Sequence, residues 1–218
     1  ARRMRRLDPF AFSAQYMQAP TPAGGAMIKR DWIQNYTGTP PKIIRYGIFA
    51  DTAQKTGQQN DYTVFLCAGT DGNNAYVLDL VRDRLEAPDL IETAKKFWKR
   101  HQPNRISNPA RFIGFFIEDK VSGTGLIQTL RRETNIPVMA MSRDRDKVSR
   151  VNDILPYVRA GRLYVPEDAP WVKEYIAELV SFSPAMTHLH DDQVDPTCDA
   201  LNELLSPGGG LIRNADWS

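Results

Sequence analysis

The stretch IIRYGIFAD, residues 43–51, is a short apolar run that ends in an acidic residue. Its length and composition are typical of a buried β-strand. Two more strand-like runs follow at 62–68 and 75–81, and the segment DGN at 71–73 between them is a hairpin-turn signal. We therefore expect three consecutive strands, of which the second and third are antiparallel.

Helices and strands alternate after these three strands. Helical periodicity covers 88–101, and further helices are expected at 124–134, 144–159 and 170–182. Short strands are expected at 112–117 and 137–140, with a small edge strand at 163–165. A last helix should run from Asp192 or Asp195 to Leu205. This order predicts an α/β fold, with a mixed β-sheet flanked by helices on both faces and crossover connections between parallel strands.

The ends of the chain differ from its body. Residues 1–41 include the stretch APTPAGG at 19–25, which cannot continue a helix or join a central strand. We interpret 1–41 as a connector from a preceding domain, and the alternative is an arm packed on the body. The main domain is expected at 42–206 and a flexible tail at 207–218.

The bulk properties limit the classes of protein. The 218 residues suffice for one domain with its own core. A net charge of +2 is too small for a polycation, so contact with nucleic acid must come from local basic patches. No apolar run approaches the roughly 20 residues that span a membrane, and no secretory signal is recognisable. Cys67 and Cys198 have no metal-type spacing and are expected to be free thiols.

Acidic residues stand where sites usually form in α/β proteins, at the ends of strands. Asp51 ends the first strand, Glu118 ends the fourth, and Asp191, Asp192 and Asp195 lie near the start of the last helix. Converging carboxylates repel one another unless a cation lies between them, and hard oxygen ligands suit Mg²⁺ or Mn²⁺. Two such ions about 4 Å apart can activate a water and stabilise the leaving oxygen of a phosphodiester.

Each acidic residue also has a purely structural interpretation. An Asp at a strand end is commonly a turn former or a helix cap, and Asp195 before Pro196 is a common helix start. A start at Pro196 would leave the third ligand open among Asp191, Asp192 and Asp195. Strand alternation points Glu118 and its neighbour to opposite faces, so only one of them can join the site.

Four segments of the sequence resemble the C-terminal nuclease domain of the large terminase subunits of tailed bacteriophages. GIFADTA at 47–53, followed by DYT at 61–63, is similar to the first catalytic strand and hairpin. IEDK at 117–120 with Ser122-Gly123 is similar to the second acidic motif, and HDDQVD at 190–195 to the third. FSAQYMQ at 12–18 with Pro20, Gly24-Gly25 and Asp31-Trp32 resembles the segment that leaves the family's ATPase domain.

The resemblance implies a ribonuclease-H-like fold and an endonuclease that cuts concatemeric double-stranded viral DNA during genome packaging, with little sequence specificity. It implies two Mg²⁺ or Mn²⁺ ions as cofactors. It also implies three partners, namely an N-terminal ATPase domain of the same polypeptide, a portal and a small terminase subunit, and a location in the host cytoplasm. No Gly-x-x-x-x-Gly-Lys-Ser/Thr phosphate loop occurs in the chain. Translocation activity is therefore expected to be absent from these residues.

The expected roles follow from the motifs. Asp51 should bridge both ions, Glu118 should hold one, and Asp192 or Asp195 should hold the other. Supporting roles are expected for Asp119, Lys120, His190 and Asp191. Binding of DNA without sequence preference depends on phosphate contacts, and the expected contacts are Lys120, Arg143, Arg145 and Lys147. Further basic clusters at 95–100 and 131–132 are more often solvated helix faces.

Three other classes remain as alternatives. Junction resolvases and transposases of the same fold use a similar acidic set. An actin-like ATPase would need glycine-rich phosphate loops, whereas QKTGQ at 54–58 has a single glycine. A non-catalytic module that docks on the packaging motor would lack the acidic residues, which are present here.

Overall fold

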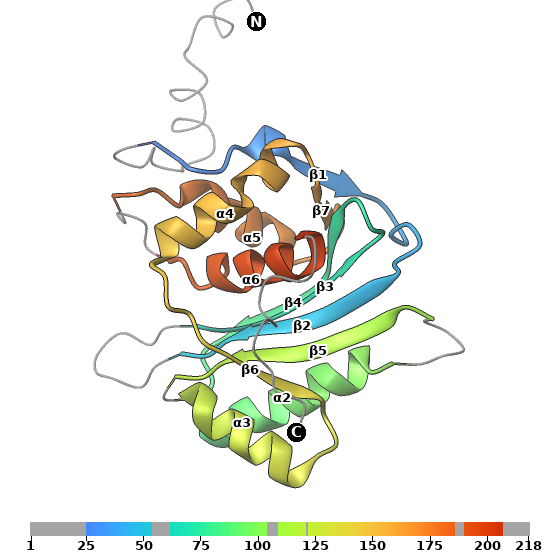
Figure 1. The fold of residues 1–218 in the computed structure, drawn as a ribbon, viewed down its shortest axis with the longest axis vertical. Helices are drawn as coiled ribbons and strands as arrows, with labels where there is room; N and C mark the ends of the chain where they lie inside the picture. The colour runs from blue at the N-terminus through green and yellow to red at the C-terminus, as the bar shows by residue number, and fades with distance from the viewer. Residues whose placement is uncertain (1–24, 54–61, 104–108, 121, 186–189, 207–218) are drawn as a thin grey trace, which may run out of the picture.

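The computed structural model describes residues 25–53, 62–103, 109–120, 122–185 and 190–206 (Figure 1). The expected connector up to residue 24, the segment 54–58 and the expected tail at 207–218 lie outside these residues. Within them the chain forms one seven-stranded sheet with helices on both of its faces.

The strands follow the order β1-β7-β4-β3-β2-β5-β6 across the sheet. Their bounds are β1 (Ile33–Tyr36), β2 (Arg45–Asp51), β3 (Thr63–Thr70), β4 (Ala75–Asp83), β5 (Arg111–Glu118), β6 (Val138–Met141) and β7 (Leu163–Pro166). Strand β3 is antiparallel to β2 and β4, and every other neighbouring pair is parallel. The three consecutive strands β2, β3 and β4 and the antiparallel hairpin are therefore confirmed, although β1 precedes them.

The helices form two layers. Their bounds are α2 (Ala87–His101), α3 (Ser122–Glu133), α4 (Lys147–Arg159), α5 (Val172–Ser181) and α6 (Val194–Leu205), with a short 3-10 turn η2 (Arg30–Trp32). Figure 1 shows α4, α5 and α6 on one side of the sheet and α2 and α3 on the other. The expected α/β fold with helices on both faces is confirmed.

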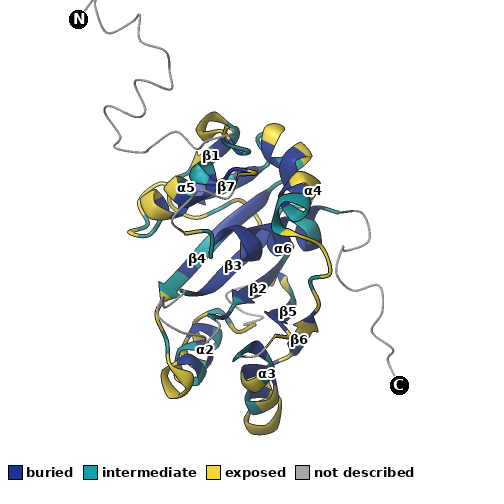
Figure 2. Ribbon diagram, turned by 90° about the vertical axis from the view of Figure 1, so that its left-hand side faces the viewer, coloured by how far each residue is buried: buried dark blue, intermediate teal, exposed yellow. Residues whose placement is uncertain are grey.

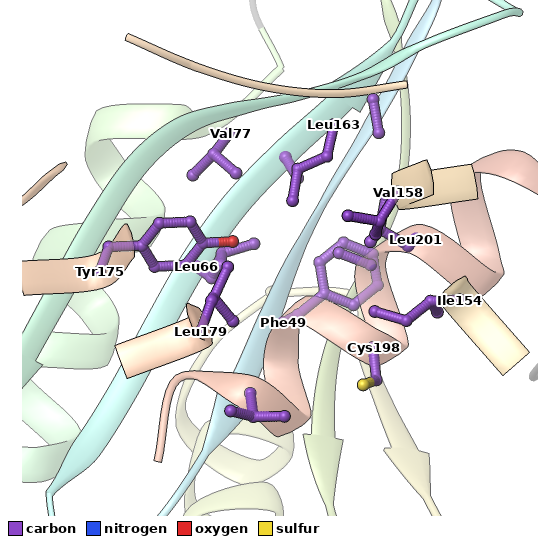
Figure 3. Close-up of a cluster of buried hydrophobic side chains, with 14 of the residues drawn as sticks. Phe49, Leu66, Val77, Ile154, Val158, Leu163, Tyr175, Leu179, Cys198 and Leu201 are labelled. Atoms are coloured by element: carbon purple, nitrogen blue, oxygen red, sulfur yellow. The ribbon is translucent and has the colours of Figure 1, made fainter. Parts of the chain in front are cut away.

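A separate hydrophobic core fills each side of the sheet, because successive side chains of a strand point to opposite faces. Phe49 of β2 is fully buried in the core beneath α4, α5 and α6, together with Ile154 and Cys198 (Figure 3). Its neighbours Ile48 and Ala50 are buried in the core beneath α2 and α3. The central strand β3 is buried along its whole length (Figure 2), as expected for a sheet covered on both faces.

Two features of the sheet differ from those expected from the sequence. Strand β1 lies inside the expected connector, pairs with β7, and follows the fully buried Ile28. Strand β7 was expected at an edge, but it lies between β4 and β1. Helix α6 begins at Val194, between the two expected starts Asp192 and Asp195, and the alternative start at Pro196 is not observed. Pro196 is accommodated in the first turn because the amide hydrogens there have no partner within the helix.

The two cysteines are free and buried, Cys67 on β3 and Cys198 on α6, as expected. Burial raises the pKa of both thiols. Among the described residues, no helix has the length and apolar character needed to cross a membrane.

Candidate metal centre

Three parallel strands end at one edge of the sheet. Ala50 of β2 is in register with Ile117 of β5, and Glu118 of β5 is in register with Met141 of β6. Asp51, Glu118 and Arg143 therefore come together at this edge, although 92 residues separate the first from the last. Alternation along the strands turns Asp51 and Glu118 to the face of the sheet that α6 covers.

Helix α6 contributes two carboxylates to the same place. Asp195 and Asp199 are four residues apart and so lie on one face of the helix. Both are buried, with 5% and 2% of the residue exposed. Asp199 was not among the expected site residues, although its four-residue spacing from Asp195 on an expected helix was an available signal.

A cleft of about 340 Å³ opens above these strand ends. It is lined by Asp51, Thr52, Ala53, Tyr62, Glu118, Lys120, Lys147, Arg150, Asp191, Asp192 and Asp195. The structure thus brings together the four expected ligands, Asp51, Glu118, Asp192 and Asp195, with Asp191 and Lys120 beside them.

Two of the expected supporting residues lie outside the lining of this cleft. Asp119 is exposed and accepts a hydrogen bond from the Thr124 hydroxyl at 2.6 Å. The side chain of His190 is 46% exposed, its Nδ1 is 3.9 Å from Asp192 Oδ2, and its ring meets Tyr62 edge-on. Of the pair at the end of β5, Glu118 is therefore the member that faces the other carboxylates.

Arg143 was predicted to contact DNA, and the structure places it elsewhere. Its side chain is only 2% exposed and lies among the acidic residues. Its Nη1 is 2.6 Å from Glu118 Oε2, 3.1 Å from Asp51 Oδ1 and 3.9 Å from Asp195 Oδ2. This inward position was not expected, because a basic residue that follows a short strand has no local sequence signal for turning inward.

The other basic residues of the 143–150 segment divide between the cleft and the surface. Lys147 Nζ lies 2.9 Å from Asp191 Oδ2 and 3.2 Å from Asp195 Oδ2, and Arg150 also pairs with Asp195. Arg145 is 58% exposed and pairs with Asp153 on the outside of α4. Lys120 also lines the cleft. Its Nζ lies 2.6 Å from Glu118 Oε1, and its side chain is 52% exposed.

At Asp51 the effect of burial and of the neighbouring carboxylates outweighs that of these cations. Burial raises the pKa of Asp51 to about 7, with Asp195 and Glu118 adding to the rise and Arg143 and Lys147 opposing it. Burial also raises the pKa of Asp192 and of Asp199. An additional cation close to Asp51 would lower the cost of its ionised form.

The donor chemistry of the cleft fits a hard divalent cation, because its acidic side chains offer only carboxylate oxygens. Within the described ranges, however, no three His, Cys, Asp or Glu side chains are grouped as a ready metal site. The Arg143 guanidinium and the Lys147 ammonium stand among the carboxylates instead. Asp51, Glu118 and Asp195 are the residues that could hold such an ion.

A buried polar network supports the loop that enters α6. Glu178 of α5 accepts hydrogen bonds from the backbone N of Gln193 at 2.6 Å and from its side-chain Nε2 at 2.7 Å. Arg82 of β4 reaches Glu178 and Asp192, both at 3.4 Å, while its guanidinium lies 3.7 Å from the centre of the Tyr62 ring. This network fixes the chain directly after Asp192.

Glu178→Ala is expected to lower the free energy of unfolding by about 3 kcal/mol, because it leaves two buried donors of Gln193 without an acceptor. Denaturant unfolding measures this loss. Glu174→Ala is the matched control, since Glu174 also pairs with Arg82 but its side chain is 70% exposed. We expect a change below about 0.5 kcal/mol there. Equal losses in the two variants would show that the buried network is unimportant.

A second link joins the loops after β2 and β5. Ser122 Oγ donates to the carbonyl oxygen of Ala53 at 2.6 Å and lies 3.1 Å from Thr52 Oγ1. Gly123 packs so tightly that a Cβ on it would lie 1.9 Å from the carbonyl oxygen of Glu118. The start of α3 is thus in direct contact with Thr52 and Ala53, which follow Asp51, and with the backbone of Glu118.

Comparison with known proteins gives one family. The model of the terminase RNase H-like domain matches residues 48–204. A search of curated protein sequences finds no match.

Solved structures with a similar fold include phage terminases. The large terminase nuclease of the thermophilic phage G20c with bound magnesium is 19% identical, with a TM-score of 0.59 over 84% of this chain and 100% of that one. The large terminase of a second thermophilic bacteriophage is 13% identical, with a TM-score of 0.58 over 81% of this chain and 43% of that one. The match therefore covers all of the G20c nuclease but less than half of the second phage protein.

Proposed function

Because the chain belongs to the family of terminase RNase H-like domains, we propose that it is a divalent-metal-dependent endonuclease that cuts double-stranded DNA during viral genome packaging. The observation that supports this best is the convergence of Asp51, Glu118 and Asp195 at the ends of parallel strands and the start of α6. Structures of the G20c nuclease with magnesium, zinc and cobalt agree with a site for divalent cations.

Asp51 is the central ligand in this proposal, because it ends β2 next to Glu118 at the end of β5, and burial raises its pKa to about 7 with Asp195 and Glu118 adding to the rise. Glu118 is the second ligand. We assign Asp195 rather than Asp192 as the third, since Asp195 shares the cations Arg143 and Lys147 with the central carboxylates, whereas Asp192 is engaged by Arg82. A pair of bound divalent cations would activate a water and stabilise the leaving oxygen of the phosphodiester.

The proposed DNA contacts are three cations in or near the cleft. Lys120 stands at its rim, Arg145 lies outside it at the start of α4, and Lys147 lines it. Such contacts recognise phosphates without reading the sequence of bases. They agree with an enzyme that cuts without strong sequence preference.

Binding of duplex DNA is expected to weaken steeply with salt. If these three cations each contact one phosphate, affinity should fall about 40-fold between 50 and 200 mM salt. Fluorescence anisotropy of a labelled duplex in EDTA measures this without cleavage. A flat salt response would contradict phosphate contacts as the basis of binding.

The chain is further proposed to act as the nuclease part of a larger packaging protein in the host cytoplasm. The second phage's large terminase, of which the chain spans 43%, has also been solved with ADP and with an ATP analogue. An ATPase domain, a portal and a small terminase subunit are the partners that this role requires. In this proposal those partners, rather than base recognition, position the cut.

Digestion of supercoiled plasmid tests the proposed activity. We expect nicked and linear products with Mn²⁺ or Mg²⁺ and none with EDTA. Equal cutting of plasmid and of a synthetic four-way junction supports a packaging nuclease, whereas cutting of the junction alone would replace it with a resolvase. A folded protein that cuts neither substrate with either metal would overturn the proposal for the chain by itself.

A further inference from the structure

All three nitrogens of the Arg143 guanidinium donate hydrogen bonds to carboxylates. Asp199 Oδ2 accepts hydrogen bonds from its Nε at 3.2 Å and from its Nη2 at 2.6 Å. The remaining nitrogen, Nη1, is thereby directed at Glu118 Oε2 and Asp51 Oδ1. Both partners are buried, since the side chain of Arg143 is 2% exposed and that of Asp199 is 3% exposed.

The burial of this pair excludes two simpler roles for Arg143. A side chain that is 2% exposed cannot bind a phosphate of duplex DNA without leaving its four carboxylate neighbours. A pair made only for stability would not need a third nitrogen directed at the proposed metal ligands. The planar guanidinium fork can bond one carboxylate with one edge and offer its remaining nitrogen to another.

We propose that Arg143, fixed by Asp199, is a positioning residue that holds Asp51 and Glu118 together and competes with the divalent cation for their oxygens. The inference rests on the proposed function, because it assigns Asp51 and Glu118 to the metal. It adds a built-in cation to the site and a reason for Asp199, which the proposed mechanism does not otherwise use.

Electrostatics gives the direction of the effect. Without Arg143, Asp51 and Glu118 lose a positive charge about 3 Å away and attract a divalent cation more strongly. Without the charge of Asp199, the positive charge of the guanidinium is no longer partly neutralised at Nε and Nη2, and it repels the incoming cation more strongly. The two changes should therefore shift metal affinity in opposite directions, which a general loss of structure would not do.

Calorimetric titration of Mn²⁺ into the protein, without DNA, tests this. We expect the Mn²⁺ dissociation constant of Arg143→Gln to fall about tenfold and that of Asp199→Asn to rise about tenfold. Arg145→Gln removes the same charge two residues away on an exposed side chain, and its dissociation constant should stay within about twofold.

Thermal unfolding with and without Mn²⁺ gives a second readout. Arg143→Gln should lower the Tm of the metal-free protein, because buried carboxylates lose their partner, and Mn²⁺ should raise that Tm more than it raises the parent's. Circular dichroism checks that each variant is folded. If Arg143→Gln does not fold, Asp199→Asn alone decides, since it keeps the size and one acceptor of the side chain.

The outcomes separate the inference from the proposed function. Unchanged or weaker Mn²⁺ binding in Arg143→Gln overturns the inference, as does unchanged or tighter binding in Asp199→Asn. A shift in Arg145→Gln as large as in Arg143→Gln overturns it too, because net charge alone would then explain the effect. A parent that cuts plasmid with Mn²⁺ keeps the proposed function in each of these cases, and a parent that neither binds Mn²⁺ nor cuts overturns both.

Discussion

Asp51→Asn is expected to reduce metal-dependent cleavage of plasmid DNA by about 1,000-fold or more, equivalent to about 4 kcal/mol of transition-state stabilisation. The variant keeps the size of the side chain and an acceptor for Arg143 Nη1, which lies 3.1 Å from Asp51 Oδ1. It removes the charge that the proposed metal requires. The fold should remain, because Asp51 ends a strand whose hydrophobic residues face two intact cores.

Initial rates of plasmid nicking with Mn²⁺ measure this effect, with circular dichroism as the check on folding. Asp31→Asn is the matched control, since it removes the same charge from an exposed residue of η2 away from the cleft. Its rate should stay within about twofold of the parent's rate, as is usual for a surface substitution. An Asp51→Asn protein as active as this control would remove Asp51 from the site.

Gly123→Ala is expected to lower the free energy of unfolding by about 3 kcal/mol and to slow cleavage as well. The added Cβ would lie 1.9 Å from the carbonyl oxygen of Glu118 and 3.3 Å from Thr52 Oγ1. Neither the end of β5 nor the start of α3 can yield by a side-chain rotation, so the backbone itself must shift. That shift displaces Glu118 from Asp51.

Gly125→Ala on the same helix is the matched control for this prediction. An added Cβ there meets nothing within 4 Å, and Gly125 is exposed. The higher helix propensity of alanine should raise the free energy of unfolding by about 0.5–1 kcal/mol. The two substitutions should therefore have opposite signs in denaturant unfolding. Two small changes of the same sign would contradict the close packing of α3 against β5.

Local sequence patterns predicted most of the fold. The apolar runs gave β2 to β6 within a few residues, and helical periodicity gave the five helices, because these signals depend on which faces are buried. Strand β1 could not be found in this way. It has four residues, and its pairing with β7 is a contact between segments about 130 residues apart in the chain, which leaves no local signal.

The site was predictable where it depends on strand ends. Asp51 and Glu118 follow apolar strands that are parallel neighbours, and this arrangement alone brings them together. Arg143, Asp199 and Glu178 depend instead on which polar groups the tertiary fold buries against one another. A buried arginine and a solvated one have the same sequence signal, so the position of Arg143 in the acidic cluster could not be predicted from the sequence.

Anomalous X-ray diffraction from crystals soaked in Mn²⁺ is the most direct test of the claim that these carboxylates hold the catalytic metal. We expect a manganese peak within about 2–2.5 Å of carboxylate oxygens of both Asp51 and Glu118. Under the same conditions Asp51→Asn crystals should show a much weaker peak or none. A manganese peak elsewhere, or none at Asp51 under conditions in which the protein cuts DNA, would contradict the account.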